Sequence, residues 1–194
     1  MQATVHLVDG VAGPHDNSWV DAVLAHLDRP AGALVARAIG FGTGVLVAFG
    51  ATGTAGFTAG PVSVRPGTAY EITDQRAGRG RGPARYLQLT TFAGRSPEWC
   101  AAFDRSIAER GWPAVQDVPG LVAGLLGSTS DGGRIALTLA ESIETLEAGA
   151  AAIMSTELLP WEKPEHLTGP DDLTILRLLH ADVPAAVPAA APAG

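Results

Sequence analysis

A repeat within the chain restricts its fold more than any other feature of the sequence. Residues 34–40 read Leu-Val-Ala-Arg-Ala-Ile-Gly, and residues 121–127 read Leu-Val-Ala-Gly-Leu-Leu-Gly. Each run precedes a glycine-containing turn and a second apolar run. Upstream, Trp19 and Trp99 occupy matching places where helices are expected to start. The order and type of the elements match in both halves, which indicates the duplication of one structural unit.

The first half of the chain is expected to contain four strands and one clear helix. Asp16, Asn17 and Ser18 offer cap oxygens for a helix that runs to residue 27. Residues 51–61 are rich in Gly, Ala and Thr, so they occupy the place of a second helix but are poor helix formers. The segments with strand character are 3–8, 33–41, 45–49 and 69–73.

The second half repeats this order with clearer helices. Ser96-Pro97-Glu98 combines a cap oxygen with proline at the first helical position, and Gly111 is expected to stop that helix. Ser142 is expected to cap a helix that runs to residue 159, before Pro160. The predicted strands are 86–92, 121–126, 134–139 and 173–179. The predicted units are a first half at 1–75, a linker at 76–84, a second half at 85–182 and a disordered Ala/Pro tail at 183–194.

Each half therefore has the β-α-β-β-α-β order of a ferredoxin-like fold. Its antiparallel sheet carries the helices on one face, and its other face must also be buried. Two tandem halves satisfy this need by closing a shared barrel. We therefore predict an α+β protein in which two tandem ferredoxin-like repeats form an intramolecular dimeric α/β barrel.

This arrangement resembles the dimeric α/β-barrel superfamily, and within it the antibiotic biosynthesis monooxygenase-like proteins. The resemblance covers residues 1–181 and rests on the element order, the paired Trp19 and Trp99, and the two Leu-Val-Ala runs. It implies a fused pseudo-dimer and, among possible activities, cofactor-free oxygenation of anthrones or quinols. The same resemblance includes heme-degrading enzymes and stress-responsive proteins, so it implies a fold more firmly than a reaction.

Composition and charge exclude several classes of function. The chain of 194 residues has 13 Lys and Arg against 20 Asp and Glu, a formal net charge of -7. An acidic chain has no general attraction for nucleic acid or an anionic membrane, and no apolar run is long enough to span one. Cys100 is the single cysteine, which rules out an internal disulfide framework. We expect a cytoplasmic protein that is a monomer or a homodimer and needs no cofactor.

Polar residues in the first strand of each half are candidates for chemistry. With Val5, Leu7, Leu87 and Leu89 placed against the helices, the alternate side chains would face the barrel interior. This set is His6, Tyr86, Gln88, Thr90 and Phe92. His6 would be the catalytic acid or base, because imidazole titrates near neutral pH, and Tyr86 and Gln88 would hold the substrate. The alternative is that these side chains fill the barrel and hydrogen-bond one another or water.

The remaining histidines give no ligand pattern. No pair among the five has helical ligand spacing, and no carboxylate motif accompanies them, so no metal site is expected. His26 is expected on the solvent face of a helix. Cys100 is expected to be a small buried residue.

The four tryptophans divide into two kinds. Trp19 and Trp99 are expected to pack a helix onto the sheet. Trp112 and Trp161 each follow a predicted helix next to proline, where they are predicted to stack on a flat aromatic substrate. The alternative role of these two is to anchor a loop.

Two glycine-rich segments invite a ligand-binding interpretation. Arg76, Arg79, Arg81 and Arg85 lie in a glycine-containing stretch that would suit phosphate, RNA or an acidic partner, or would form a solvated linker. That stretch lacks an aromatic residue for base stacking. Residues 40–44 resemble a nucleotide loop but join two strands, so a hairpin turn is predicted.

The sequence therefore leaves three classes of function open. The first is an enzyme that oxidises or rearranges a small aromatic or polyketide-like substrate without a metal or flavin. The second is a non-catalytic ligand-binding or stress-responsive protein with the same cavity. The third is a scaffold that uses the arginine-rich stretch or the tail as its contact.

Overall fold

The computed structural model describes residues 1–13, 16–28, 30–39, 42–50, 53–164 and 167–185. The elements of the first half are β1 (Gln2–Asp9), α1 (Ser18–His26), β2 (Gly32–Ala38), β3 (Thr43–Phe49), β4 (Phe57–Ala59), β5 (Val62–Val64) and β6 (Thr68–Ala77). Those of the second half are β7 (Tyr86–Phe92), α2 (Pro97–Ser106), the π-helical η1 (Ile107–Gly111), α3 (Trp112–Val115), β8 (Leu121–Ser128), β9 (Arg134–Ala140), α4 (Ile143–Ser155) and β10 (Asp172–Asp182).

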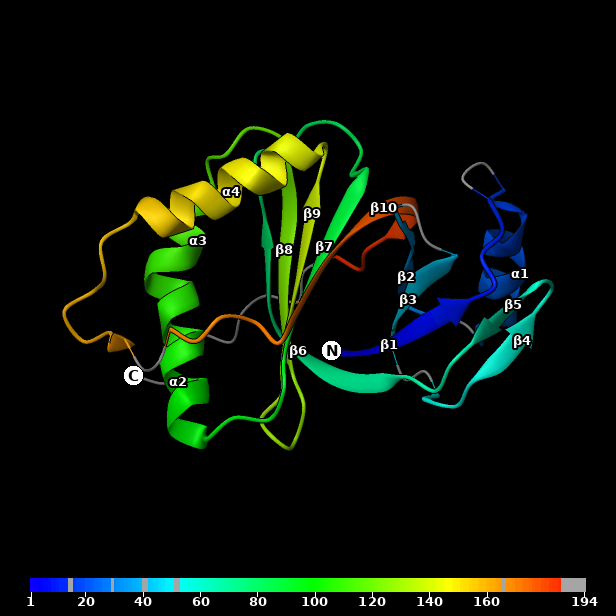
Figure 1. The fold of residues 1–194 in the computed structure, drawn as a ribbon, viewed down its shortest axis with the longest axis horizontal. Coiled ribbons are helices and arrows are strands. Elements are labelled where there is room, and N and C mark those ends of the chain that lie inside the picture. Colours follow the sequence, from blue (N-terminus) through cyan, green and yellow to red (C-terminus); the bar gives the residue numbers. More distant parts are fainter. Residues whose placement is uncertain (14–15, 29, 40–41, 51–52, 165–166, 186–194) are drawn as a thin grey trace.

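The strands close into a barrel that both halves share. Following the hydrogen-bonded neighbours gives the order β3-β2-β10-β7-β9-β8-β6-β1, and β1 returns to β3. The last strand of each half crosses to the other half, since β6 pairs with β8 and β10 pairs with β2. The helices of the second half lie on one side of the barrel, and α1 lies on the other with β4 and β5 (Figure 1). The predicted fold class is confirmed.

The barrel interior is apolar. Its core contains alternate side chains from each barrel strand, with Leu34, Val47, Leu137 and Leu176 among those that are almost fully buried. Closing the sheet removes this face from water on all sides, which suits the most apolar row of every strand.

The predicted assignment of strand faces is the reverse of the observed one. Leu87 and Leu89 belong to the barrel core, whereas Phe92 packs outward against Trp99 and Phe103 of α2. The prediction of interior-facing side chains is therefore wrong for His6, Tyr86, Gln88, Thr90 and Phe92. The sequence of a single strand with polar and apolar residues on both faces does not show which face points inward. That face is determined by the apolar residues of the strands that pair with it.

A strand hairpin covers part of the first half where a second helix would lie. Strands β4 and β5 form an antiparallel pair, and β5 adds to the edge of β1. The hairpin packs with α1 over the outer face of the sheet, where Trp19, Val20 and Val23 are buried. The Gly, Ala and Thr composition that disfavours a helix is compatible with this short hairpin.

The long helix of the second half does not stop at Gly111, contrary to prediction. Gly111 has right-handed helical dihedrals, and the chain continues through η1 into α3. A π-helical turn changes the hydrogen-bond register just before Pro113, which lacks an N–H donor. Trp112 therefore lies within this helical run instead of after it.

Other helix boundaries agree only in part with the sequence. The Ser96 hydroxyl accepts a hydrogen bond from the amide of Trp99, and Ser142 caps α4 in the same way. Helix α4 ends at Ser155, four residues earlier than predicted, because Thr156 is already extended. Asn17 precedes α1 but makes no capping hydrogen bond through its side chain.

The junction between the halves begins inside a strand. Strand β6 extends to Ala77, so Arg76 is part of the sheet, and Arg79 forms an exposed ion pair with Asp117 at 2.7 Å. The domain boundaries stay a prediction. His15, His166, two residues of the predicted 40–44 turn, and residues 186–194 of the predicted tail lie outside the described residues.

Candidate functional site

The outer faces of the two halves are filled to different extents. In the first half, Thr4, His6 and Val8 are each no more than 2% exposed beneath α1 and the hairpin. In the second half, Gln88 and Thr138 point toward the helices but remain half-buried. Among the described residues, the layer between sheet and helices is therefore less completely buried at these positions of the second half.

A continuous row of residues crosses this part of the sheet. Arg76 of β6 pairs with Gly124 of β8, Gly124 pairs with Thr138 of β9, and Thr138 pairs with Gln88 of β7. Directly paired residues in an antiparallel sheet share one face. We name these four residues, together with Trp112 above them, the second-half surface.

The indole of Trp112 covers the glycine in this row. A Cβ atom placed on Gly124 would lie 2.8 Å from Cζ3 of Trp112, so only glycine admits the ring at this distance. The guanidinium of Arg76 lies 5.8 Å from the centroid of the same ring. The structure therefore brings predicted site residues Trp112 and Gln88 onto one surface.

Polar groups of the second-half surface are only partly satisfied by one another. The Gln88 amide donates to the Thr90 hydroxyl at 3.3 Å. The Arg76 Nε donates to Asp74 at 2.7 Å, and these two side chains are 30% and 26% exposed. The surface thus combines an aromatic ring, hydrogen-bonding groups and a fixed charge, which is the composition of many small-molecule sites.

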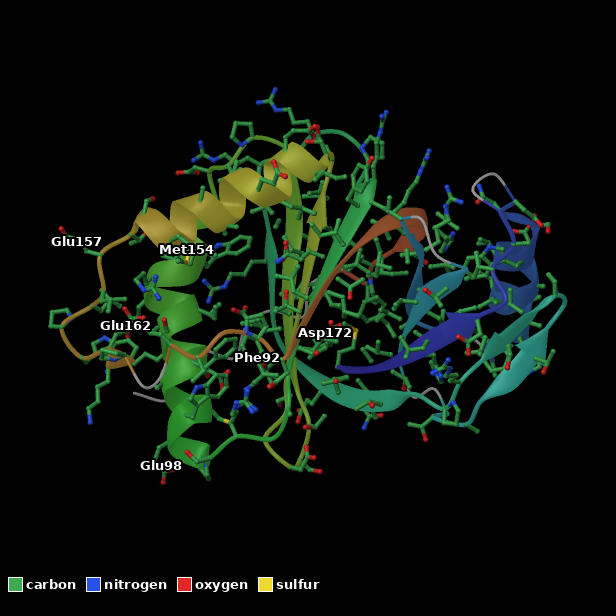
Figure 2. All side chains as sticks on the ribbon, in the orientation of Figure 1. Phe92, Glu98, Met154, Glu157, Glu162 and Asp172 are labelled. Carbon is green, nitrogen blue, oxygen red and sulfur yellow. The ribbon has the colours of Figure 1, made fainter. Side chains whose placement is uncertain are left out.

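A buried ion pair fixes the segment that follows α4. The Glu162 side chain is 1% exposed and accepts two hydrogen bonds from the Arg110 Nε, and it also accepts from the Ser106 hydroxyl and the Leu159 amide. Burial opposes ionisation of Glu162, but these hydrogen bonds outweigh it and hold the pKa of the carboxyl below its ordinary value. Figure 2 shows Glu162 at the helical layer and Phe92 at the sheet.

The other predicted substrate-binding tryptophan lies elsewhere. Trp161 donates its indole N–H to Glu109 at 3.0 Å, and Arg105 lies 4.2 Å from its ring centroid. Because Arg105 and Glu109 are about half exposed, this cluster occupies the solvent side of the helical layer. The structure does not bring Trp161 together with Gln88 or Trp112.

His6 and Tyr86 also lie apart from each other. The His6 ring is 1% exposed under the first-half hairpin, with Nδ1 2.9 Å from the carbonyl oxygen of Arg65 and Phe57 at its edge. Tyr86 is half-buried at the start of β7 on the same face as Gln88. The catalytic role of His6 and the binding roles of Tyr86 and Trp161 stay predictions.

Several packing roles are confirmed. Trp19 and Trp99 are buried between a helix and the sheet, and Cys100 is buried beside Trp99. His26 is exposed as expected, although it stacks on Phe57 at 4.2 Å.

A separate cavity of about 470 Å³ lies at the start of α4. Gly82, Arg85 and Thr145 contribute to its lining, and Glu141 in its wall accepts a hydrogen bond from the Gly82 amide. The predicted catalytic and substrate-binding residues do not line it, but Arg85 of the predicted arginine-rich stretch does. This hydrogen bond joins the segment between the halves to the residue just before the cap of α4.

Sequence reasoning does not place Arg76, Gly124 or Thr138 on this surface. It considers Arg76 for ligand binding only as part of an arginine-rich linker, and the other two lie in apolar runs that predict only strands. Their common position depends on the pairing of β6, β8 and β9, which only the closed barrel defines.

The described residues contain neither a metal-binding cluster nor a helix that could cross a membrane. No group of three or more His, Cys, Asp or Glu side chains there could hold a metal ion. Among the same residues, no helix is long and apolar enough to cross a membrane.

The fold and this surface define a class of protein. It is a tandem ferredoxin-like chain closed on itself as an intramolecular dimeric α/β barrel, with helix-covered sheet faces in both halves. No protein-family model and no curated protein sequence matches the chain.

Several solved structures share this fold. The chain is similar to a ferredoxin-fold protein related to antibiotic biosynthesis monooxygenases from Listeria monocytogenes, with a TM-score of 0.55 at 13% identity, covering 92% of this chain and 95% of that one. It is similar to an anthrone oxidase-like protein, with a TM-score of 0.54 at 13% identity over 99% and 96% of the two chains. A heme-degrading enzyme from Listeria monocytogenes gives a TM-score of 0.53 at 9% identity over 91% and 99%. At these identities the likeness concerns the fold.

Proposed function

We propose that the chain binds a small, flat aromatic molecule on the second-half surface. The observation that carries this proposal is the half-buried row of Arg76, Gly124, Thr138 and Gln88, in which Gly124 lies against the indole of Trp112. Trp112 would stack on the ligand, and Gln88 and Thr138 would hydrogen-bond its polar edge. We further propose that the protein acts in the cytoplasm as a monomer or homodimer.

The finer proposal is that this ligand is a polyketide-like substrate that reacts directly with oxygen. Loss of a proton from an acidic anthrone or phenol leaves an electron-rich anion. For an anthrone, the methylene group loses two hydrogens, one oxygen atom forms the new carbonyl, and the other leaves as water. Molecular oxygen is the oxidant, so the step balances without a further reductant. The fold shared with an anthrone oxidase-like protein supports this choice.

The sequence predicts His6 as the base, but the His6 side chain is 1% exposed under the first-half hairpin and is not part of the second-half surface. A catalytic His6 would therefore act at a second reaction site in the first half. Oxygen uptake with an anthrone distinguishes the sites. A Thr138→Phe variant would fill the second-half surface, whereas His6→Gln would alter only the first half.

Native mass spectrometry of the protein as purified tests binding. The expected result is a non-covalent additional mass that disappears on denaturation and is absent from Thr138→Phe. Circular dichroism of both proteins controls for folding. If wild type and Thr138→Phe carry the same additional mass, the ligand lies elsewhere and the proposed site is wrong.

Turnover separates an enzyme from a binding protein. The oxygenase proposal requires one oxygen consumed per anthrone lost, and the rate must fall in Thr138→Phe or His6→Gln. The oxygenase proposal is rejected if the ligand binds at the second-half surface and is released unchanged, with no oxygen uptake. The protein would then be a non-catalytic binding protein.

A further inference from the structure

The second-half surface contains one residue that the first half of the chain supplies. Arg76 lies in β6, the last strand of the first half, and reaches the surface because β6 pairs with β8 of the other half. Trp112, Thr138 and Gln88 all come from the second half. The site is therefore completed across the junction that closes the barrel.

The guanidinium of Arg76 is held in place but not fully used. Its Nε donates to Asp74, and among the described residues its two terminal nitrogens have no recorded hydrogen-bond partner. The ion pair is 2.7 Å long and both side chains stay about a quarter to a third exposed. Arginine has five N–H donors, so one bond to Asp74 leaves donors for a second acid group.

The position of Arg76 over the Trp112 ring indicates which ligands would supply this second acid group. The guanidinium carbon lies over the indole ring, 5.8 Å from its centroid, so an acid group on a ligand at the edge of this ring would come near the terminal nitrogens. Resting on the proposed function, we infer that Arg76 selects aromatic ligands that carry an anionic group, such as a carboxylate, sulfonate or phenolate. Arg76 is thus a specificity-determining residue contributed in cis by the first half.

The carboxylate of Asp74 does not cancel this preference. Asp74 fixes the guanidinium on its Nε side and thereby lowers the ordering cost of a second contact. Water and salt screen a partly buried charge less than a fully exposed one. The guanidinium of Arg76 would therefore interact more strongly with a charge on the ligand.

Two fluorescent probes with one aromatic scaffold test the inference. Anilinonaphthalene sulfonate is anionic, and phenylnaphthylamine is its neutral counterpart. Each is titrated into the full chain in wild type, Arg76→Gln, Arg76→Lys and Thr138→Phe. Binding at the second-half surface is the component of the signal that Thr138→Phe removes.

We expect Arg76→Gln to weaken binding of the anionic probe by about tenfold, a change typical of one charge-assisted contact, and the neutral probe by less than about twofold. Arg76→Lys should recover part of the loss, because it restores the charge without the planar fork. Raising the salt concentration should weaken only the anionic probe. The matched control Arg79→Gln removes an exposed arginine that pairs with Asp117 outside this surface, and it should change neither titration.

Two results would reject the inference while leaving the proposed site intact. One is equal weakening of both probes by Arg76→Gln, which would assign Arg76 to the support of Trp112. The other is wild-type affinity for both probes in Arg76→Gln. If Thr138→Phe removes neither probe, or wild type binds neither, the proposed site itself is wrong, and the inference falls with it.

Discussion

Gly124 determines how closely the helical layer approaches the sheet in the second half. The six-membered part of the Trp112 indole occupies the space that a side chain at this position would need. The strand-forming residues on either side of Gly124 do not show that glycine is required at this position. The ring that requires it belongs to Trp112, on a helix twelve residues earlier in the chain.

Gly124→Ala should destabilise the protein by about 1–3 kcal/mol, because its Cβ would overlap the Trp112 ring and force it to move. It should also weaken binding of an aromatic probe. Urea denaturation and tryptophan fluorescence measure the two effects. The control is Gly149→Ala in α4, where the added Cβ makes an ordinary contact at 3.9 Å with Val115 and should stabilise the helix by up to about 1 kcal/mol. Equal stability of the two variants would contradict this account.

Glu162 is a second residue whose environment has a measurable consequence. Replacing it by Gln leaves Arg110 buried without its counter-charge, so Glu162→Gln should cost about 3–5 kcal/mol at neutral pH. The pKa of Glu162 is lowered in the folded protein from its ordinary value of 4.5. Its ionised form therefore stabilises the fold fully at pH values above 4.5. That contribution is lost as the pH falls through the lower folded pKa.

The stability difference between wild type and Glu162→Gln should therefore shrink as the pH is lowered below 4.5. Urea denaturation of both proteins across this range measures it. Glu109→Gln is the control, since Glu109 also accepts hydrogen bonds but is exposed. A wild-type to Glu162→Gln difference that stays constant into acid would show that this carboxylate does not titrate with folding.

At the scale of elements, the two matched helices begin differently despite their paired tryptophans. Helix α2 has a serine cap whose hydroxyl accepts from the Trp99 amide at 3.3 Å. Helix α1 begins after Asn17 without such a bond, and Asp16 instead accepts from the amide and hydroxyl of Ser18.

Ser96→Ala should therefore cost about 1 kcal/mol, the usual value of a lost N-cap. Asn17→Ala should cost only a few tenths of that, because no capping bond is removed. Thermal denaturation of both variants against wild type checks the order. A larger loss for Asn17→Ala would mean that its side chain caps α1 after all.

Local signals predicted the elements well and their orientation poorly. The strand at 86–92 and the capped helix start at Ser96 were correct to the residue, because β-propensity and caps act over a few neighbours. The end of the helix at Gly111 was wrong, since a π-helical turn carries the chain past a glycine and a proline. The faces of β1 and β7 were wrong because burial depends on strands distant in the sequence.

At the scale of the whole molecule, the two crossing strands hold the halves together. Strand β6 pairs with β8 and β10 pairs with β2, so each half lends its last strand to the other. The apolar core inside the barrel belongs to neither half alone. The repeat predicted this arrangement, because a sheet with one uncovered apolar face needs a second sheet.

A chain ending after residue 80, or one beginning at residue 81, should not form a stable monomer. Each would expose the barrel-facing apolar surface of its strands to water. Size-exclusion chromatography with light scattering should find self-association or aggregation of each half, and a heterodimer when they are refolded together. A folded monomer of either half would contradict a shared core.

Only two members of the candidate site could be predicted from the sequence. Trp112 and Gln88 were found because an unmatched aromatic residue and a polar residue in an apolar strand stand out locally. Arg76, Gly124 and Thr138 become neighbours only through the register of the closed barrel. The sequence marks Arg76 as part of an arginine-rich stretch, but its place on this surface depends on the crossing of β6.

The crossing strands also bear on how such a protein can diverge. In a barrel built from two identical chains, each substitution appears twice and both sheet faces must change together. A single gene that encodes both halves removes that constraint. One face here is sealed by a hairpin and a histidine, and the opposite face keeps polar groups within reach of water. Fusion thus lets one half be sealed while the other keeps polar groups open to water, and Arg76 of the first half lies on the sheet face of the second.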